Sequence, residues 1–296
     1  MTTTQFKCEL HMHSTYSDGS VTPEGLLEHA QQIGLSVVAI TDHDNAHGSR
    51  AAIPAAARLG IELIPAIEFT GRWDDCYRPG WGGDVDILGY FVDLDDPHFR
   101  RVEQATLDDI QGRIEACCAR LTAAGYPVTM DDVFAQNPRY GGARQLRQAL
   151  QARGYVDSYD ESIELFTEHW QHVRLSCFTI EEHIATIRAA GGVAVLAHPQ
   201  GIRCGEGWIG ADRLARVVEM GIDGIEIYHR HMDEAARAHF MPLAEQFGLL
   251  ISGGSDEHGF SPDLPHMGKQ PVTRAMVEGL RARHIERLAA LDAAQE

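Results

Sequence analysis

The sequence predicts an α/β fold in which helices cover parallel strands, and two observations support this prediction. Short apolar runs rich in β-branched residues alternate along the chain with longer helical patterns, as in folds built from parallel sheets. Polar side chains follow the apolar runs directly; Thr41, Asp42 and His43, for example, come after the run at 35–40. In such folds the functional site lies at the carboxyl ends of the strands.

Capping signals and apolar runs place the elements of the first part of the chain. Thr22-Pro23-Glu24 combines an N-cap residue, a proline at the first helical position and an acid in the first turn, and Gly34 ends the helix that follows. The continuous apolar run at 35–40 predicts a strand buried on both faces. Residues 72–83 predict a loop. The expected strands lie at 6–10, 35–40, 61–67 and 84–92, and the expected helices at 22–33, 49–59 and 99–121.

The middle of the chain has no buried strand pattern. We therefore expect a barrel-forming α/β domain built from residues 1–95 and 174–296, and a small helical insertion domain at 96–173 that caps the substrate site. The strand–helix alternation resumes at Thr179-Ile180-Glu181-Glu182, which is a capping box. The later helices are expected at 179–190, 211–220, 233–247 and from 277 to the end, and the later strands at 193–197, 224–228 and 249–252.

The composition excludes some classes of function. The chain has 296 residues and a formal net charge of -18, so it lacks the basic surface with which a DNA-binding protein neutralises phosphates. No run is long enough to span a membrane, and residues 1–5 lack the features of a signal peptide. The six cysteines form no C-x-x-C pair. We therefore expect reduced thiols, a cytoplasmic location, and no DNA or membrane partner, while the oligomeric state stays open.

Histidines and carboxylates are concentrated at the expected strand ends. His11 and His13 are two residues apart, so an extended strand points both imidazoles to one face. Taken singly, Glu68 could cap a helix and Asp256 could close a turn. Together with the other candidates they suit a cluster of two or three Zn, Mn or Fe(II) ions, with Glu68 as a bridge. The candidates are His11, His13, Asp18, His43, Glu68, His198, Asp256 and His258.

These residues and their order resemble the PHP (polymerase and histidinol phosphatase) family of metal-dependent phosphoesterases. The resemblance implies a distorted (β/α)7 barrel, the PHP fold, with a two- or three-metal cluster at its C-terminal face. The most similar members have a helical insertion and include nucleoside 3′,5′-bisphosphate phosphatases and a 5′–3′ exoribonuclease. The matching motifs are His11-Met12-His13-Ser14, Ser17-Asp18-Gly19, Thr41-Asp42-His43-Asp44, Glu68, Ala197-His198-Pro199 and Gly254-Ser255-Asp256-Glu257-His258-Gly259.

The resemblance also implies how three ions share the ligands. A hydroxide that bridges the metals would attack the phosphorus, and the metals would neutralise the non-bridging oxygens. The implied ligands are His11, His13, Glu68 and Asp256 for the first ion, Glu68 and His198 for the second, and Asp18, His43 and His258 for the third.

Two positions depart from the family pattern. Asp86 stands where the strand usually carries a histidine ligand. We expect Asp86 to bind the second ion, which leaves that site weaker, tuned to Mn or Mg, or empty; the alternative is an ordinary strand carboxylate. In the insertion, Gly141 replaces a histidine that faces the substrate, so the leaving-group pocket is expected to differ.

Four further residues are candidates for contact with the substrate. Arg139 keeps the family position of a phosphate clamp, whereas Arg144 is expected to be a solvated helix residue. His229 and His231 follow a strand, and one of them is expected to touch the substrate or act as a general acid; a polar loop is the alternative. We expect Arg139 and His229 to be catalytic, and the substrate-binding residues to be Arg139, His229, His231 and Arg203.

The expected function is hydrolysis of a small phosphomonoester, with nucleotides and nucleoside bisphosphates as candidates, by two or three divalent ions (Mn, Zn or Fe). One alternative is a phosphodiesterase or 5′–3′ exoribonuclease on the same site, against which the net charge of -18 argues. The other is a metal-binding regulatory module with weakened or lost catalysis, of which Asp86 and Gly141 would be signs.

Overall fold

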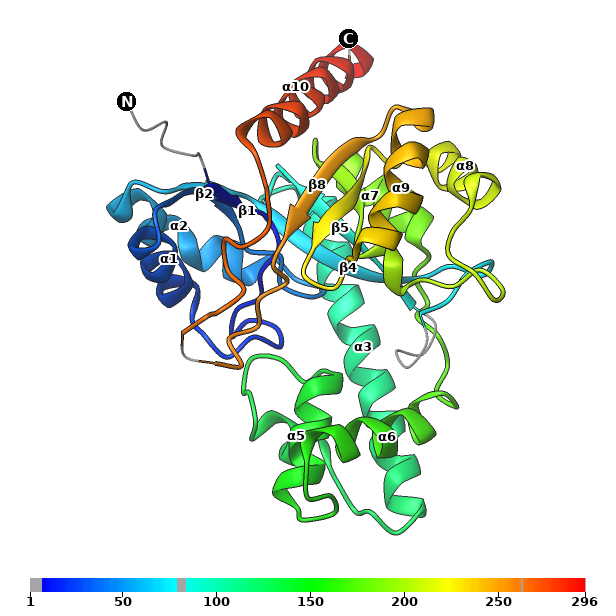
Figure 1. Ribbon diagram of the computed structural model, residues 1–296. Helices are drawn as coiled ribbons and strands as arrows, with labels where there is room; N and C mark the ends of the chain where they lie inside the picture. The colour runs from blue at the N-terminus through cyan, green and yellow to red at the C-terminus, as the bar shows by residue number, and fades with distance from the viewer. Residues whose placement is uncertain (1–6, 79–83, 262, 296) are drawn as a thin grey trace.

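The computed structural model describes residues 7–78, 84–261 and 263–295 (Figure 1). An α/β part contains the strands and most helices, and a smaller all-helical part, coloured green, hangs from it on the long helix α3. Residue 6 of the first expected strand and residues 79–83 of the expected loop lie outside the described residues. Within the described residues, no helix is both long enough and apolar enough to cross a membrane.

The described strands form two sheets. The first sheet is parallel with the order β1-β2-β3, and the second has the order β4-β5-β6-β7-β8. Two isolated bridges connect the sheets, one between Met12 and Glu257 and one between His43 and Glu68. The strands are β1 Lys7–Glu9, β2 Leu35–Ala39, β3 Glu62–Ile64, β4 Ala66–Arg72, β5 Asp84–Tyr90, β6 Val193–Leu196, β7 Gly224–His229 and β8 Leu250–Gly254.

The expectation of one strand at 61–67 is wrong. Two strands occupy this region, β3 in the first sheet and β4 in the second, and Pro65 separates them. Proline has no N–H to donate to a ladder, so the chain leaves the first sheet at this residue. Glu68 consequently lies inside β4 and not at a strand end.

The expectation that all strands are parallel is also wrong for β5, which runs antiparallel to both β4 and β6. A parallel connection needs a crossover of a dozen or more residues, usually with a helix. The segment between β4 and β5 is shorter than that, so the chain turns back. Strands β6, β7 and β8 are parallel, as predicted.

The helices agree with the expected ranges to within a few residues at their ends. The predicted caps are present: the Thr22 side chain accepts a hydrogen bond from Gly25 N, and Thr179 forms a capping box with Glu182. The helices are α1 Pro23–Gln32, α2 His47–Leu59, α3 Pro97–Ala123, α4 Met130–Phe134, α5 Ala143–Ala152, α6 Tyr159–Trp170, α7 Ile180–Ala189, α8 Ala211–Glu219, α9 Glu234–Phe247 and α10 Arg274–Gln295, with a 3-10 turn at Pro199–Gly201.

Helices α3 to α6 have an apolar core of their own. It includes Ile114 and Cys117 of α3, Leu146 of α5 and Trp170 of α6. The first turn of α3 belongs to a different cluster, because Phe99 packs with Phe69 of β4. A single helix is therefore built into both parts of the molecule.

The expectation of reduced thiols is wrong for one pair of cysteines. Cys76 and Cys204 form a disulfide that joins the segment after β4 to the segment after β6. The two residues are 128 positions apart, and sequence spacing alone does not reveal a pair that only the fold brings together. Among the other cysteines, Cys177 is exposed, and the free thiols of Cys8, Cys117 and Cys118 are buried.

Candidate functional site

The side chains predicted to bind metal converge on one place, although they come from strands of both sheets. They follow β1, β2, β6 and β8 or lie within β4 and β5. Among the described residues they form overlapping groups, in each of which one ligand atom per residue lies within 4.8 Å of the others. The groups are His13-Asp18-His43-His258, His11-Glu68-His198, His11-His13-Asp256 and His43-Glu68-Asp86.

Glu68 lies at the centre of these groups and is fully buried. Its Oε2 atom is 3.2 Å from the Nε2 atoms of both His11 and His13. Its Oε1 atom is 2.9 Å from Nε2 of His198. Because the two oxygens face different histidines, the geometry suits a carboxylate that bridges two ions.

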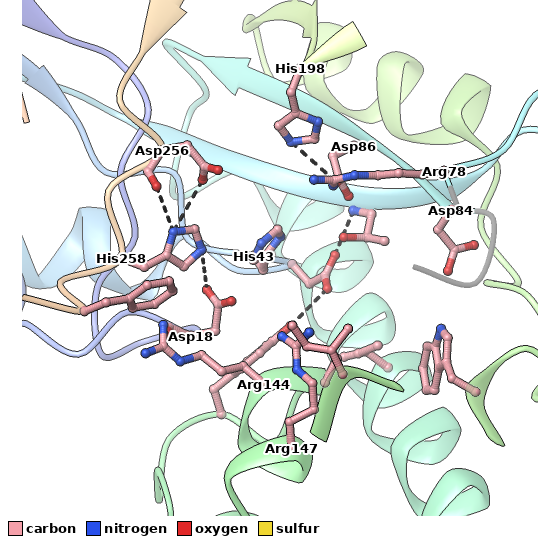
Figure 2. Close-up of a pocket in the computed structure, with 18 of the residues that line it drawn as sticks. Asp18, His43, Arg78, Asp84, Asp86, Arg144, Arg147, His198, Asp256 and His258 are labelled. Carbon is pink, nitrogen blue, oxygen red and sulfur yellow. Dashed lines mark hydrogen bonds and ion pairs between the residues drawn. The ribbon is translucent and has the colours of Figure 1, made fainter. Parts of the chain in front are cut away.

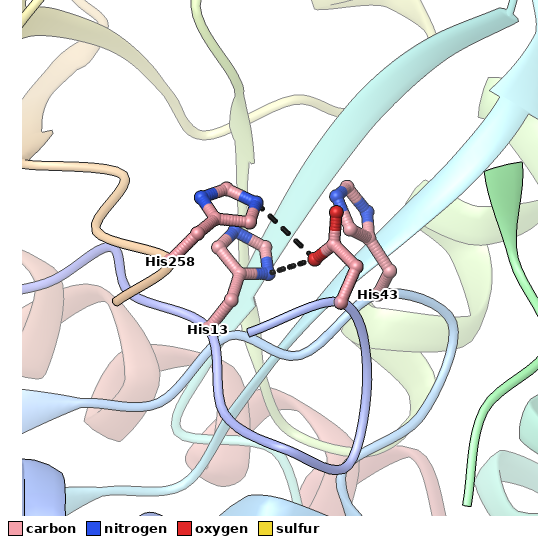
Figure 3. Close-up of side chains that lie close together, drawn as sticks. His13, His43 and His258 are labelled. Atoms are coloured by element: carbon pink, nitrogen blue, oxygen red, sulfur yellow. Dashed lines mark ion pairs between the residues drawn. The ribbon is translucent and has the colours of Figure 1, made fainter. Parts of the chain in front are cut away.

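A second carboxylate, Asp18, lies among three imidazoles. Its Oδ1 atom is 3.2 Å from His258 Nε2 and 3.7 Å from His13 Nδ1. Figure 3 shows His13, His43 and His258 side by side, and the ring of His13 stacks on both neighbours with centroids 4.5 Å and 4.1 Å apart. Asp18 reaches this place because the turn after β1 folds back toward the strand ends.

Further carboxylates hold the histidines in place. Glu226 of β7 accepts a hydrogen bond from Nδ1 of His11 at 2.9 Å through one oxygen, and from the backbone N–H of His198 at 2.8 Å through the other. With its Nδ1 occupied, His11 presents Nε2 to the cluster. Metal-binding histidines in proteins are commonly oriented by a carboxylate in this way. The sequence interpretation did not identify Glu226, which lies inside an apolar strand and not at its end.

Several buried atoms of the cluster make no hydrogen bond with the described residues. They are both ring nitrogens of His13, Oδ1 of Asp18 and Nδ1 of His198. A buried polar atom without a partner is costly. Imidazole nitrogens and carboxylate oxygens are the donors that Zn, Mn and Fe(II) accept, and bound ions would satisfy these atoms. The residues around His13 and Asp18 therefore fit divalent metal ions.

The cluster has a strongly negative electrostatic environment. Burial lowers the pKa of His11, but Glu68, Glu226 and Asp256 outweigh burial and hold this pKa well above its ordinary value. For His13 the neighbouring Asp256 and Glu68 likewise overcome burial and raise the pKa to about 10. Histidines in such a field attract protons or metal ions, so the site has the charge that a cation requires.

The backbone takes an unusual conformation at two of the predicted ligands. His198 has φ +27° and Asp256 has φ +52°. Residues other than glycine rarely adopt this left-handed backbone conformation, and those that do are often found at functional sites. Hydrogen bonds fix both peptides: Asp256 N donates to His11 O at 2.8 Å, and His198 N donates to Glu226.

The cluster forms one wall of a cavity of about 360 Å³ between the sheets and the helical part (Figure 2). This volume lies in the range of small-molecule sites. Arginines and aromatic rings face the cluster from the other sides. The arginines that line the cavity are Arg78, Arg144, Arg147 and Arg230, and the aromatic residues are Tyr140, Tyr159, Trp170 and Phe260.

The predicted substrate residues have different positions relative to this cavity. His231 lines it. His229 is buried behind it, with Nε2 3.3 Å from Asp256 Oδ2 and Nδ1 3.0 Å from the Gln200 amide. Arg139 is exposed outside the cavity, its guanidinium 5.2 Å from the ring of Tyr16. Arg203 also lies outside the lining and donates to the carbonyl of Gln200 at 2.7 Å.

The expectation that Arg144 is solvated is wrong. The residue is buried, donates to the Asp18 carbonyl at 2.8 Å, and lies with its guanidinium 3.6 Å from the ring centroid of Phe260. Gly141, in contrast, does not line the cavity: a Cβ atom added there would lie 3.1 Å from the ring of Phe134. The spacing of Arg144 and Arg147 on one helix face is a sequence signal for the arginine pair.

The chain is similar in sequence to known proteins. The family model described as "PHP domain" matches residues 9–198. A phosphoribosyl 1,2-cyclic phosphate 1,2-diphosphodiesterase from Eggerthella lenta is 32% identical over 88% of this chain and 97% of its own length. The 5′-3′ exoribonuclease Rnm of Escherichia coli is 28% identical, with 92% of each chain covered. A 3′,5′-nucleoside bisphosphate phosphatase from Chromobacterium violaceum is 27% identical over 93% of this chain and 96% of its own.

The fold also matches solved structures. A Bifidobacterium adolescentis protein assigned as a metal-dependent phosphoesterase superposes with a TM-score of 0.80 at 27% identity. The match covers 94% of this chain and 96% of the other. The likeness therefore includes both the α/β part and the helical part.

Proposed function

Because the chain belongs to the PHP domain family and is a metal-dependent phosphoesterase, we propose that it hydrolyses a small phosphomonoester, with nucleotides and nucleoside bisphosphates as the leading substrates. One observation carries this proposal. The metal-type cluster and the buried arginines Arg144 and Arg147 line the same cavity of about 360 Å³. A cavity of this size, with a metal site on one wall and cations on another, suits a compact substrate with more than one anionic group.

The ligand assignment is part of the proposal. Bound divalent ions would polarise the phosphoryl oxygens and lower the pKa of a bound water. Glu226 fixes the ring orientation of His11, and His11, His13 and Glu68 are fully buried. The residues proposed to hold the first ion are His11, His13, Glu68 and Asp256, and those for another ion are Asp18, His43 and His258.

We assign recognition of the substrate's anionic groups to Arg144 and Arg147 of α5, and not to Arg139. The first two line the cavity and are buried, whereas Arg139 is exposed outside it. His231 lines the cavity beside Arg230 and would contact the substrate. His229 would act through Asp256, because its Nε2 atom faces that carboxylate at 3.3 Å.

The architecture proposed with this function is a distorted (β/α)7 barrel. The two sheets share their edges through the Met12–Glu257 and His43–Glu68 bridges, which supports a closed arrangement. Residues 96–173 would be a cap domain, supported by their separate apolar core. The predicted cytoplasmic location stays a prediction.

Hydrolysis of a phosphodiester is a second candidate function. It is supported by the relatives from Eggerthella lenta and Escherichia coli, which are named as a diphosphodiesterase and an exoribonuclease. The rings of Tyr159 and Phe260 in the cavity lining offer aromatic surface for stacking a base. An exoribonuclease would also need to accommodate the rest of a strand, for which the net charge of -18 is unfavourable.

A substrate screen separates these candidates. The purified chain is assayed for phosphate release with Mn, Zn or Fe(II), using nucleoside monophosphates, nucleoside bisphosphates, sugar phosphates, cyclic phosphates and short RNA. We expect release of phosphate from monoesters, fastest for a bisphosphate, and no release with Asp256→Ala. Faster cleavage of cyclic phosphates or RNA than of any monoester would contradict the proposal in favour of the second candidate.

A further inference from the structure

A fixed cation lies beside one group of the metal-type cluster. Nη1 of Arg78 is 2.5 Å from Oδ2 of Asp86, and both residues line the cavity. Figure 2 shows the guanidinium at Asp86, with His198 next to them. The Asp86 oxygen that accepts from Arg78 is also the one that faces His198, at 3.6 Å from its Nε2.

This place is where the second ion of the family would be bound. Of the residues proposed for it, Glu68 and His198 are present, but Asp86 replaces a neutral imidazole with a carboxylate that already has a cationic partner. A divalent ion bound there would lie beside the positive guanidinium that already neutralises Asp86, and water screens the repulsion between the two cations only weakly in a buried site. The set formed by Glu68, Asp86 and His198 therefore does not fit a divalent ion, whereas the groups around His13 do.

The segment that carries Arg78 is firmly attached near His198. The Cys76–Cys204 disulfide joins this segment to the one that follows β6. Beside the disulfide, Tyr77 and Arg203 pair through their backbones, with N···O distances of 2.9 Å and 2.8 Å. Arg78 also packs on Gly201, where an added Cβ would lie 3.4 Å from its Nε. These contacts hold the guanidinium of Arg78 in its place beside Asp86.

We propose that Arg78 takes the place of the second divalent ion and donates hydrogen bonds to a non-bridging oxygen of the substrate phosphoryl group. Asp86 then serves to hold the guanidinium and not to ligate metal. Arginine suits this task because its charge is permanent and its planar group matches phosphate. The inference rests on the proposed function for the identity of the substrate, but the number of ions bound can be measured without it.

The first test measures the number of ions per chain. The full-length protein is dialysed against Mn, and bound Mn is determined by mass spectrometry for wild type, Arg78→Lys, and Arg78→Ala combined with Asp86→His. We expect two ions for wild type and for Arg78→Lys, which keeps the positive charge. The double variant should bind a third, because the cation is gone and an imidazole ligand is restored.

A third ion in the wild type, or no gain in the double variant, would overturn the inference. Folding of each variant is verified by circular dichroism and by its thermal unfolding temperature. Arg213→Ala is the matched control, since Arg213 pairs with Asp75 of the same segment at 3.4 Å but does not line the cavity. This variant should bind as many ions as wild type.

The second test measures recognition of phosphate. We expect Arg78→Ala to weaken inhibition by inorganic phosphate and to raise KM about 10-fold or more, because a charge-assisted hydrogen bond is lost. Arg213→Ala should leave both unchanged. An Arg78→Ala variant with unaltered phosphate inhibition would contradict the inference, whereas a wild type that hydrolyses no phosphoester at all would contradict the proposed function instead.

Discussion

Asp256 contacts histidines on two sides of the cluster. Its Oδ1 atom lies 3.1 Å from His13 Nε2 and its Oδ2 atom 3.3 Å from His229 Nε2. Asp256→Ala removes a proposed metal ligand, and we expect kcat to fall by at least about 100-fold, since even indirect support of a metal ligand is worth about 10–100-fold. Steady-state kinetics measures this loss, and mass spectrometry should find less bound Mn.

The matched control for this variant is Asp212→Ala, which removes an exposed aspartate from α8. It should retain the activity and metal content of wild type. If Asp256→Ala kept the full rate, the assignment of the first ion would be wrong.

His183 makes the folded state sensitive to acid. Its ring stacks on Phe69 with centroids 4.4 Å apart, and burial lowers its pKa to about 4. The unfolded chain takes up this proton near pH 6.5. Between pH 6.5 and 4 the unfolded state therefore binds more protons than the folded state, and the free energy of unfolding decreases as the pH is lowered. We expect this group to cost up to about 3 kcal/mol of unfolding free energy between pH 7 and 4, measured by urea denaturation.

His183→Gln keeps a donor for the Thr70 carbonyl, which His183 Nε2 faces at 3.3 Å. This variant should lose part of the acid sensitivity, while His98→Gln, at an exposed position, should not. Identical pH profiles for wild type and His183→Gln would refute the prediction.

At the level of single residues, the sequence predicts which metal-type side chains come together better than it predicts the arginines that face them. His11, His13 and Asp256 were identifiable because their residue types and their places after strands indicate metal chemistry. Arg78 was not, because an arginine on a loop has no such signal until the fold brings it to the cavity, and the spacing of Arg144 and Arg147 places them on one helix face without indicating what that face meets.

At the level of elements, the end of β8 packs directly against the backbone of His11. A Cβ added to Gly254 would overlap the backbone N and Cβ of His11. We expect Gly254→Ala to lower the unfolding free energy by about 1–3 kcal/mol through overpacking, and to reduce activity by displacing His11. Chemical denaturation and kinetics measure the two effects.

Gly112 provides the opposite case on α3. No atom lies within 4 Å of a Cβ added there, and the residue is exposed in the middle of the helix. Gly112→Ala should therefore raise the unfolding free energy by about 0.5–1 kcal/mol with unchanged kinetics. Equal destabilisation by both substitutions would show that close packing is not the cause at Gly254.

Elements with local signals were predicted well, and elements defined by pairing were not. Thr22 and Thr179 cap their helices as expected because a cap depends only on neighbours in sequence. The antiparallel direction of β5 and the split at Pro65 depend on which strands meet, which periodicity does not encode.

At the level of the whole molecule, the buried carboxylates oppose folding unless cations accompany them. Glu68 and Asp256 are buried, and the partly buried Asp18 lies beside His13, so we expect a chelator to lower the unfolding temperature. Added Mn should restore it, with about 2.7 kcal/mol of stabilisation at 100 times the dissociation constant. Differential scanning fluorimetry tests this, with NaCl of equal ionic strength as the control; an unfolding temperature insensitive to Mn would contradict it.

The disulfide should raise the free energy of unfolding, because it closes a loop of 128 residues and so restricts the unfolded chain. The Cys76→Ser and Cys204→Ser double variant is expected to lose about 2–4 kcal/mol of unfolding free energy, measured in urea without reductant. Cys177→Ser, at an exposed free thiol, is the control. Equal stability of the double variant and wild type would mean that the thiols are not paired in solution.

The length of helix α3 sets the distance between the two walls of the cavity, which are the strand ends and the helical part. Phe99 at its start packs with the sheet, and Ile114 packs in the helical part, so the number of residues between them sets both the separation and the relative rotation of those walls. Each residue inserted would lengthen the helix by about 1.5 Å and turn it by about 100°. A change in substrate size would therefore require whole turns to be gained or lost, since any other length rotates Arg144 and Arg147 away from the strand ends.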